Sequence, residues 1–221
     1  VRPLLSFAAG ELSGADKTHA TIAGAAVELI HVYSLVHDDL PCMDNDTLRR
    51  GKPTVHVQFG VAQAMLAGDA MQALAFDVLT PDEGIAPALQ AKLVRLLARS
   101  AGHGGMAGGQ AIDLASVGKP LDETTLRDMH RRKTGALLQA SVLMGAACGD
   151  CSPEAWQALS EYGAAIGLAF QVVDDILDVT QDSDVLGKTA GKDMDNNKPT
   201  YVSVLGLDEA NRYACELRDQ A

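Results

Sequence analysis

Apolar residues recur at spacings of three and four along most of this chain, which is the periodicity of helices that bury one face. The pattern predicts helices over residues 19–36, 61–79, 88–101, 126–147 and 153–179, with a break at 80–84. Ser152, Pro153 and Glu154 fit the N-cap and first turn of the last helix. No segment shows convincing strand alternation. The sequence therefore predicts one all-α domain, a helix bundle over residues 1–221.

The composition agrees with closely packed helices and excludes several functions. Aromatic residues make up only 4% of the 221 residues, whereas a β-sandwich is richer in β-branched and aromatic residues. The net charge of −11 argues against nucleic acid as a partner, because the phosphate backbone requires a basic surface. The best apolar stretch, residues 23–36, contains Glu28 and His31 and is shorter than the roughly 20 residues of a membrane span. We therefore expect no span.

Four cysteines are few for a disulfide scaffold, so a reducing cytoplasm is the expected location. Cys148 and Cys151 have the spacing of a metal-binding pair, but no second such pair or nearby histidine pair completes a site. A helix end followed by a loop is the simpler interpretation.

Two clusters of aspartates lie at the ends of strongly apolar segments. The first acidic motif contains Asp38, Asp39 and Asp44, and the second contains Asp174, Asp175 and Asp178. Crowded carboxylates repel one another and lose hydration, whereas carboxylate oxygens suit a hard cation such as Mg²⁺. A solvated acidic helix end is the alternative for either motif alone, but the presence of both favours metal binding.

The spacing of the aspartates differs between the two motifs. Asp174 and Asp178 are four residues apart, so they share one helical face. Asp38 and Asp44 are six apart, about 120° out of phase on a regular helix, and Pro41 between them removes a backbone donor. We expect this segment to leave the helix and to bring Asp44 round towards Asp38.

Basic residues in the breaks between helices indicate a diphosphate-binding site. They are Arg49, Arg50, Lys133, Lys188, Lys192 and Lys198. Mg²⁺ usually binds through one or two carboxylates plus substrate phosphates, and arginine grips phosphate oxygens directly. The chain has no Gly-x-x-x-x-Gly-Lys-Ser/Thr loop, so a P-loop nucleotide enzyme is not predicted.

Five sequence blocks follow one another in the order and spacing of the trans-prenyl diphosphate synthases. They are Asp-Asp-x-x-x-x-Asp (38–44), Leu-Arg-Arg-Gly (48–51), Gly-Gly-Gln-x-x-Asp (108–113), Lys-Thr-Gly (133–135) and Gly-Leu-Ala-Phe-Gln-x-x-Asp-Asp-x-x-Asp (167–178). From Arg2 to about Leu205 the chain resembles this family, and most of all its bacterial farnesyl-forming type. The resemblance implies an antiparallel helix bundle of the isoprenoid synthase type around a deep central cavity, and usually a homodimer. It also implies three Mg²⁺ ions and a cytoplasmic role in isoprenoid biosynthesis.

The resemblance further implies roles for individual residues. It assigns metal binding to Asp38, Asp39, Asp44, Asp174, Asp175 and Asp178, and substrate binding to Arg2, His31, Arg49, Arg50, Lys133, Thr134, Gln171, Lys188 and Lys198. Of the second set, Arg2, His31 and Arg50 would contact isopentenyl diphosphate. The others would contact the allylic diphosphate or the cation formed from it. Direct catalytic roles would fall to Asp38, Asp39, Asp44, Asp174, Asp175, Lys133 and Lys188.

The implied reaction requires no general base from the protein. Metal neutralises the allylic diphosphate as it leaves, and a cavity that excludes water protects the resulting cation. The π bond of isopentenyl diphosphate then attacks, and in the family's scheme the proton goes to the departing diphosphate. For His31 the resemblance favours a diphosphate contact over a core histidine, whereas for His37 ordinary packing is the preferred interpretation.

The chain departs from the family pattern at its ends. The family begins with Gly-Gly-Lys-Arg-x-Arg-Pro, of which only Val1-Arg2-Pro3 is present, and the C-terminal helices look short. We therefore expect a sequence that lacks its N- and C-terminal ends, including a lysine that binds isopentenyl diphosphate in the family.

Product length is expected to depend on Tyr33 and Ser34, five and four residues before Asp38. At 1.5 Å per residue Tyr33 lies about 7.5 Å along the helix from the metal, where its ring would stop a growing chain; ordinary helix packing is the alternative. Farnesyl-forming bacterial relatives pair such an aromatic residue with two extra residues, here Pro41 and Cys42. The prediction is a C15 product, made from dimethylallyl diphosphate through geranyl diphosphate.

Three other functions are alternatives to this prediction. A geranylgeranyl diphosphate synthase tends to have a smaller residue at position 33. A terpene cyclase would carry Asn/Asp-x-x-Ser/Thr-x-x-x-Glu in place of the second acidic motif. A non-catalytic subunit of a heteromeric synthase typically loses one motif, and both are intact here.

Overall fold

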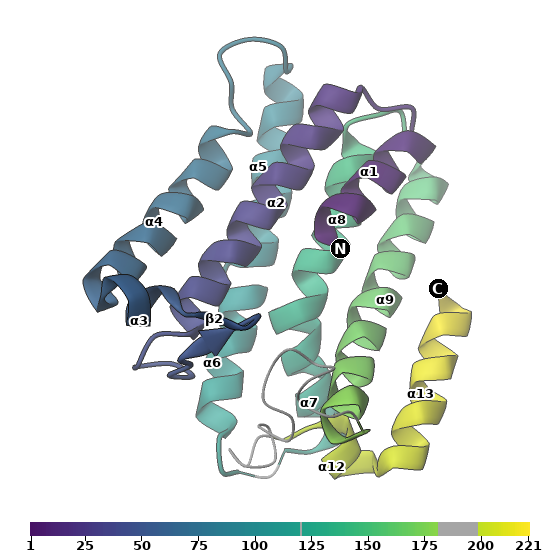
Figure 1. The fold of residues 1–221 in the computed structure, drawn as a ribbon. Helices are drawn as coiled ribbons and strands as arrows, with labels where there is room; N and C mark the ends of the chain where they lie inside the picture. The colour runs from purple at the N-terminus through teal and green to yellow at the C-terminus, as the bar shows by residue number, and fades with distance from the viewer. Residues whose placement is uncertain (120, 181–198) are drawn as a thin grey trace. The chain divides into compact units, whose positions relative to one another are not determined.

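The structure, a computed structural model, describes residues 1–119, 121–180 and 199–221. Apart from one short hairpin, the regular elements of these residues are helices (Figure 1), so the all-α prediction is confirmed. The chain falls into two compact units. Unit 1 contains Val1–Leu97 and Ser141–Cys151, and unit 2 contains Ala98–Ala140 and Ser152–Ala221. Two helices, α5 (Pro87–Ala101) and α8 (Ala136–Ala147), contribute residues to both.

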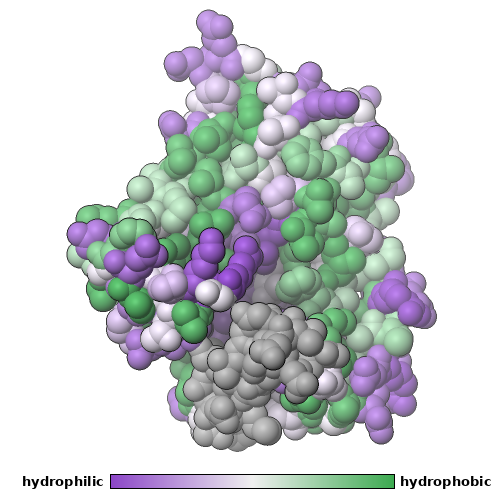
Figure 2. Space-filling view, in the orientation of Figure 1, coloured by the Kyte–Doolittle hydropathy of each residue, from purple (hydrophilic) through white to green (hydrophobic). Residues whose placement is uncertain are grey.

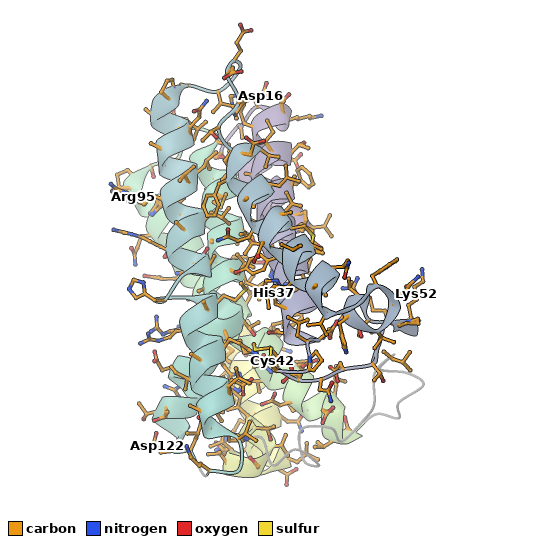
Figure 3. All side chains as sticks on the ribbon, turned by 90° about the vertical axis from the view of Figure 1, so that its left-hand side faces the viewer. Asp16, His37, Cys42, Lys52, Arg95 and Asp122 are labelled. Carbon is orange, nitrogen blue, oxygen red and sulfur yellow. The ribbon has the colours of Figure 1, made fainter. Side chains whose placement is uncertain are left out.

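Unit 1 is organised around the long helix α2 (Lys17–Asp38). Its other helices are α1 (Arg2–Leu12), α3 (Val55–Phe59) and α4 (Val61–Asp77), and α2 packs against both α1 and α4 (Figure 1). The buried face of α2 is built largely of small residues, among them Ala23 and Ala26, which allow neighbouring helices to approach closely. On α5, Arg95 is exposed and points outwards (Figure 3), as the amphipathic pattern predicts.

Helix α2 (Lys17–Asp38) is longer than its sequence pattern indicated. The Asp16 carboxylate caps its first turn by accepting a hydrogen bond from the Thr18 amide at 2.7 Å. Helix α2 has 22 residues and contains an 18-residue window with a mean hydropathy of 1.3, so it is long and apolar enough to cross a membrane by length and composition alone. The expectation that no segment reaches that length was wrong. Core helices of soluble proteins and signal sequences pass the same test.

A short antiparallel hairpin follows the first acidic motif, although the sequence predicted no strand. It pairs β1 (Leu48–Arg49) with β2 (Lys52–Pro53), and Arg49 lies opposite Lys52. The two connecting residues, Arg50 and Gly51, have φ angles of 51° and 73°. Positive φ at both positions is typical of the type I′ turn that closes tight hairpins. Two-residue strands are too short to show alternation, which is why sequence reasoning missed them.

Unit 2 is organised around the 28-residue helix α9 (Pro153–Thr180), which packs beside α13 (Leu207–Gln220) (Figure 1). Its other helices are α6 (Met106–Ser116), α7 (Glu123–His130) and α12 (Tyr201–Leu205). The Ser152 hydroxyl accepts from the Ala155 amide at 3.2 Å, which confirms the predicted start of α9. The hydrophobic core of unit 2 contains Leu126, Met129, Val172, Tyr201, Ala210 and Leu217.

The predicted helix over residues 126–147 is interrupted by a π-helical turn. This turn, η1 (Arg131–Gly135), joins α7 to α8. Single π turns are rare and occur frequently at functional sites. This one contains the Lys-Thr-Gly block, so it places Lys133 and Thr134.

Candidate active site

The first acidic motif leaves the helix as predicted. Helix α2 ends at Asp38, and the Asp44 amide then donates a hydrogen bond to the Asp38 carbonyl oxygen at 2.9 Å. Asn45, which follows, has a positive φ of 51°. The loop containing Pro41 and Cys42 therefore returns Asp44 to Asp38, and both aspartates stay half-buried. Figure 3 shows Cys42 in this loop.

Asp39 is held by Arg49 from the hairpin. The guanidinium donates from Nε to both carboxylate oxygens at 3.0 Å and from Nη2 to Oδ1 at 2.7 Å. Asp39 is only 3% exposed, so its charge would be costly without a partner. The hydrogen bond to Asp39 raises the pKa of Arg49. Asp39 and Arg49 therefore form one rigid charged pair beside Asp38.

Arg2, His31 and Arg50, the predicted contacts of isopentenyl diphosphate, all belong to unit 1, where the two arginines act on the imidazole. Burial lowers the pKa of His31 to about 3, and the positive charges of Arg2 and Arg50 lower it further. The imidazole is therefore neutral at neutral pH. The Nε of Arg2 is buried and has no hydrogen-bond partner among the described residues. The positive charges of Arg2 and Arg50, together with the unsatisfied buried donor of Arg2, suit an anion.

Tyr33 and Ser34 lie on α2, half-buried, in the turn before Asp38. Burial raises the pKa of Tyr33, and the Asp38 charge raises it further. The Tyr33 ring meets the His37 ring edge to face at 5.7 Å. The Ser34 hydroxyl donates to the His31 carbonyl within the helix at 2.8 Å. Of these two residues, Tyr33 is therefore the one that presents a bulky ring near the acidic motif.

His37 serves packing, in agreement with the preferred interpretation. Its Nε2 lies 3.0 Å from the Met65 carbonyl oxygen of α4. The ring also occupies the space above Gly68, where a Cβ atom would lie 2.0 Å from Nε2. Figure 3 labels His37 on α2.

The second acidic motif lies on α9 and its three aspartates differ in environment. Asp174 is half-buried, whereas Asp175 and Asp178 are 2% and 4% exposed. Asp175 accepts hydrogen bonds from the Tyr201 amide at 2.8 Å and from Gln171 Nε2 at 2.9 Å. Asp174 also lines an apolar groove of about 810 Å³ formed by α9 and α13. In each motif, therefore, the second aspartate is buried and held by protein donors.

Lys133, Thr134 and Gln171, predicted at the allylic diphosphate, lie close together in unit 2. The Thr134 hydroxyl donates to Gln171 Oε1 at 3.0 Å. Lys133 Nζ donates to Asp113 Oδ2 at 2.5 Å. Sequence reasoning did not select Asp113, although it ends the Gly-Gly-Gln-x-x-Asp block. Lys188, Lys192 and Lys198 lie outside the described residues.

A buried histidine, also missed from the sequence, packs beside Asp175. His130 is stacked on Tyr201 with ring centroids 5.3 Å apart, and its Nε2 lies 3.9 Å from Asp175 Oδ2. Burial lowers the pKa of His130 to about 4, so the ring is neutral at neutral pH. Neither ring nitrogen has a hydrogen-bond partner in the part of the chain that the structure describes.

The donor set fits a metal that is bound jointly with substrate. Among the residues described, no three His, Cys, Asp or Glu side chains gather closely enough to hold a metal ion by themselves. Mg²⁺ does not need such a cage, because it binds through one or two carboxylates plus substrate phosphates. Asp38 and Asp174 each have a carboxylate that could bind Mg²⁺ together with substrate phosphates.

All four cysteines are free thiols, and burial raises the pKa of Cys148 to about 11.

Known proteins resemble the chain along its whole length. The family model for polyprenyl synthetase matches residues 1–220. The chain is 48% identical to farnesyl diphosphate synthase of Haemophilus influenzae, covering 100% of this chain and 76% of that protein. It is 49% identical to chloroplastic geranylgeranyl pyrophosphate synthase 12 of Arabidopsis thaliana, covering 100% and 63%. The crystal structure of a geranyltransferase from Helicobacter pylori, complexed with magnesium and isoprenyl diphosphate, is 37% identical with a TM-score of 0.88, covering 99% and 74%.

The chain belongs to the polyprenyl synthetase family. It is a prenyltransferase, since its helical fold, its two acidic motifs and the relatives that match this whole chain agree.

Proposed function

We propose that the enzyme condenses isopentenyl diphosphate with dimethylallyl and then geranyl diphosphate, and releases farnesyl diphosphate. Overall identity does not select this product, because geranylgeranyl-forming relatives are as similar as farnesyl-forming ones. The observation that carries the assignment is local. The Tyr33 ring lies in the helical turn before Asp38, and the charge of the Asp38 carboxylate contributes to the raised pKa of Tyr33. The ring would therefore meet the tail of a substrate whose diphosphate is bound at the first acidic motif.

Mg²⁺ is the proposed cofactor, expected as three ions. The proposed ligands are Asp38, Asp39, Asp44, Asp174, Asp175 and Asp178. The magnesium in the geranyltransferase structure from Helicobacter pylori supports this proposal. When bound, magnesium would neutralise the allylic diphosphate and make it a good leaving group.

The remaining charged residues would bind and orient the two diphosphates. Arg2, His31 and Arg50 would receive isopentenyl diphosphate, whose oxygens would satisfy the buried Nε of Arg2. Arg49 would contact the allylic diphosphate while Asp39 fixes its guanidinium plane. Lys133, Thr134 and Gln171 would line the allylic diphosphate and the cation formed from it, together with Lys188 and Lys198. The released proton would go to the departing diphosphate, so no side chain is needed as a base.

A homodimer in a reducing cytoplasm is the proposed setting. Helix α4 carries exposed apolar side chains, including Val61, Met65, Leu66 and Leu74. Figure 2 shows hydrophobic surface over this helix. A second copy of the chain would cover such a face, and light scattering after size exclusion would report the mass. The four free thiols agree with a reducing compartment.

The product assignment is tested by changing the proposed wall. Tyr33→Ala should shift products from C15 to C20 or longer, whereas Tyr33→Phe keeps the ring and should still make C15. Ser34→Ala, at the second position expected to set product length, should lengthen the products less than Tyr33→Ala, because the Ser34 side chain is small and its hydroxyl is bonded within its own helix. The measurement is chromatography of the dephosphorylated products. A C15 product from Tyr33→Ala would show that Tyr33 does not stop elongation.

A further inference from the structure

Two glycines on neighbouring helices lie in close contact with the π turn that contains Lys133. On α6, a Cβ atom at Gly109 would lie 2.2 Å from the backbone nitrogen of Lys133. On α9, a Cβ atom at Gly167 would lie 2.7 Å from the Cα of Gly135. Two neighbouring helices therefore touch the turn backbone to backbone. The Cα of Lys133 has little room to move.

The Lys133 side chain, by contrast, is long and mobile unless something holds its end. A lysine ammonium sits on four methylenes and loses rotamer entropy when it is fixed in one place. Asp113 projects from α6, one turn beyond Gly109, and is 4% exposed. Its Oδ2 accepts from Lys133 Nζ at 2.5 Å. The same helix thus contacts Lys133 at its backbone through Gly109 and at its charged end through Asp113.

We propose that Asp113 is a positioning residue for the prenyl transfer, fixing the Lys133 ammonium where it meets the allylic diphosphate. This inference rests on the proposed role of Lys133. It explains why a Gly-Gly-Gln-x-x-Asp block accompanies a Lys-Thr-Gly block in one sequence: Gly109 and Asp113 hold the turn that the second block forms. Thr134 is held in parallel, through Gln171, by Asp175.

A purely electrostatic role for Asp113 predicts the opposite effect. Its negative charge offsets the positive charge of Lys133, so removing it would strengthen attraction to a diphosphate. A positioning role predicts weaker use of the allylic substrate. Asp113→Asn is nearly isosteric and removes the charge, so the direction of its effect separates the two.

The test is a double-mutant cycle of Asp113→Asn and Lys133→Gln. Steady-state rates are measured against geranyl diphosphate at saturating isopentenyl diphosphate and Mg²⁺. Loss of a charged hydrogen bond predicts that Asp113→Asn lowers kcat/KM by about 10- to 100-fold. In the Lys133→Gln background the same change should cost less than about 3-fold, because coupled residues are not additive. Asp128→Asn is the matched control: Asp128 pairs with Arg131 and Arg132 of the same turn at 2.6 and 2.7 Å, and near-normal kinetics are expected.

Several results would overturn the inference. An equal loss in both backgrounds would show that Asp113 only stabilises the fold, and unchanged or improved kinetics in Asp113→Asn would exclude positioning. An unaffected Lys133→Gln enzyme would contradict the proposed function of Lys133 as well, which distinguishes the two failures. If Asp113→Asn does not fold, Asp113→Glu keeps the charge but displaces the carboxylate by one methylene. Positioning predicts at least a several-fold loss of kcat/KM in that variant, and wild-type kinetics would contradict it.

Discussion

Replacing Gly109 by alanine tests whether the packing of α6 against the π turn controls catalysis. The added Cβ would lie 2.2 Å from the Lys133 backbone nitrogen and 2.6 Å from its Cα. Carbon atoms in ordinary contact lie about 3.5 Å apart, so α6 and the turn must separate by roughly 1 Å. The atoms it meets are backbone atoms, which cannot swing aside as a flexible side chain could. The displacement must therefore reach Lys133.

The cost to stability should be small and the cost to activity large. Overpacking costs about 1–3 kcal/mol, and the better helix propensity of alanine returns up to about 1 kcal/mol. A net loss of about 1 kcal/mol lowers Tm by roughly 2–4 °C in a chain of this size and leaves the protein folded. A misplacement of about 1 Å in a catalytic group can cost roughly 100-fold in rate. We therefore expect Gly109→Ala to be folded and nearly inactive.

Gly104→Ala is the matched control, because a Cβ atom there meets nothing within 4 Å. Calorimetry gives Tm, and steady-state rates with geranyl diphosphate give kcat/KM. Wild-type kcat/KM in Gly109→Ala, with the added methyl accommodated, would refute the claim that this contact places Lys133. An equal loss in Gly104→Ala would show that alanine in this region acts through some other route.

Three further predictions follow from the acidic motifs and the cationic cluster. Asp38→Ala and Asp174→Ala should each reduce turnover by about two orders of magnitude or more while the helical circular dichroism is retained; full activity with Mg²⁺ present would contradict metal binding there. Arg49→Lys keeps the charge but cannot make the bidentate contact with Asp39, so KM for the allylic substrate should rise about tenfold, and unchanged constants would contradict that role. His31 should stay neutral as pH falls through 6.5, because its folded pKa is about 3. In the unfolded chain the imidazole is protonated near pH 6.5, so His31 lowers the free energy of unfolding as pH falls from 6.5 towards 3. Protonation of the His31 ring near pH 6.5 in an NMR titration of the folded protein would contradict this prediction.

Much of the fold was predictable because periodicity reports buried faces directly. The predicted helices correspond to α2, α4, α5 and α9, and Ser152 caps α9 as expected. The exception is the segment 126–147, which was predicted as one helix yet contains the π turn. Periodicity of three to four residues does not distinguish one wide turn from a regular one. The turn depends on close contact with Gly109 and Gly167, which are distant in sequence.

The site was predictable in its residue types but not in its internal contacts. The six-residue spacing of Asp38 and Asp44, with Pro41 between them, correctly indicated a departure from the helix. The hydrogen bond from the Asp44 amide to the Asp38 carbonyl oxygen confirms it. Nothing local indicates that Asp39 is held by Arg49 or Asp113 by Lys133, because these pairs form across separate elements. His130 lies in a polar stretch and is 5% exposed in the structure. Its burial depends on packing against Tyr201.

We propose that this chain makes farnesyl diphosphate by magnesium-dependent condensation, and one assay of product formation tests this. The most direct measurement supplies labelled isopentenyl diphosphate with dimethylallyl diphosphate, with and without Mg²⁺, and resolves the dephosphorylated products by chain length. We expect label in a C15 alcohol when Mg²⁺ is present and no incorporation when it is chelated. A C20 product would contradict the farnesyl assignment. Incorporation that persists without a divalent cation would contradict the role given to the two acidic motifs.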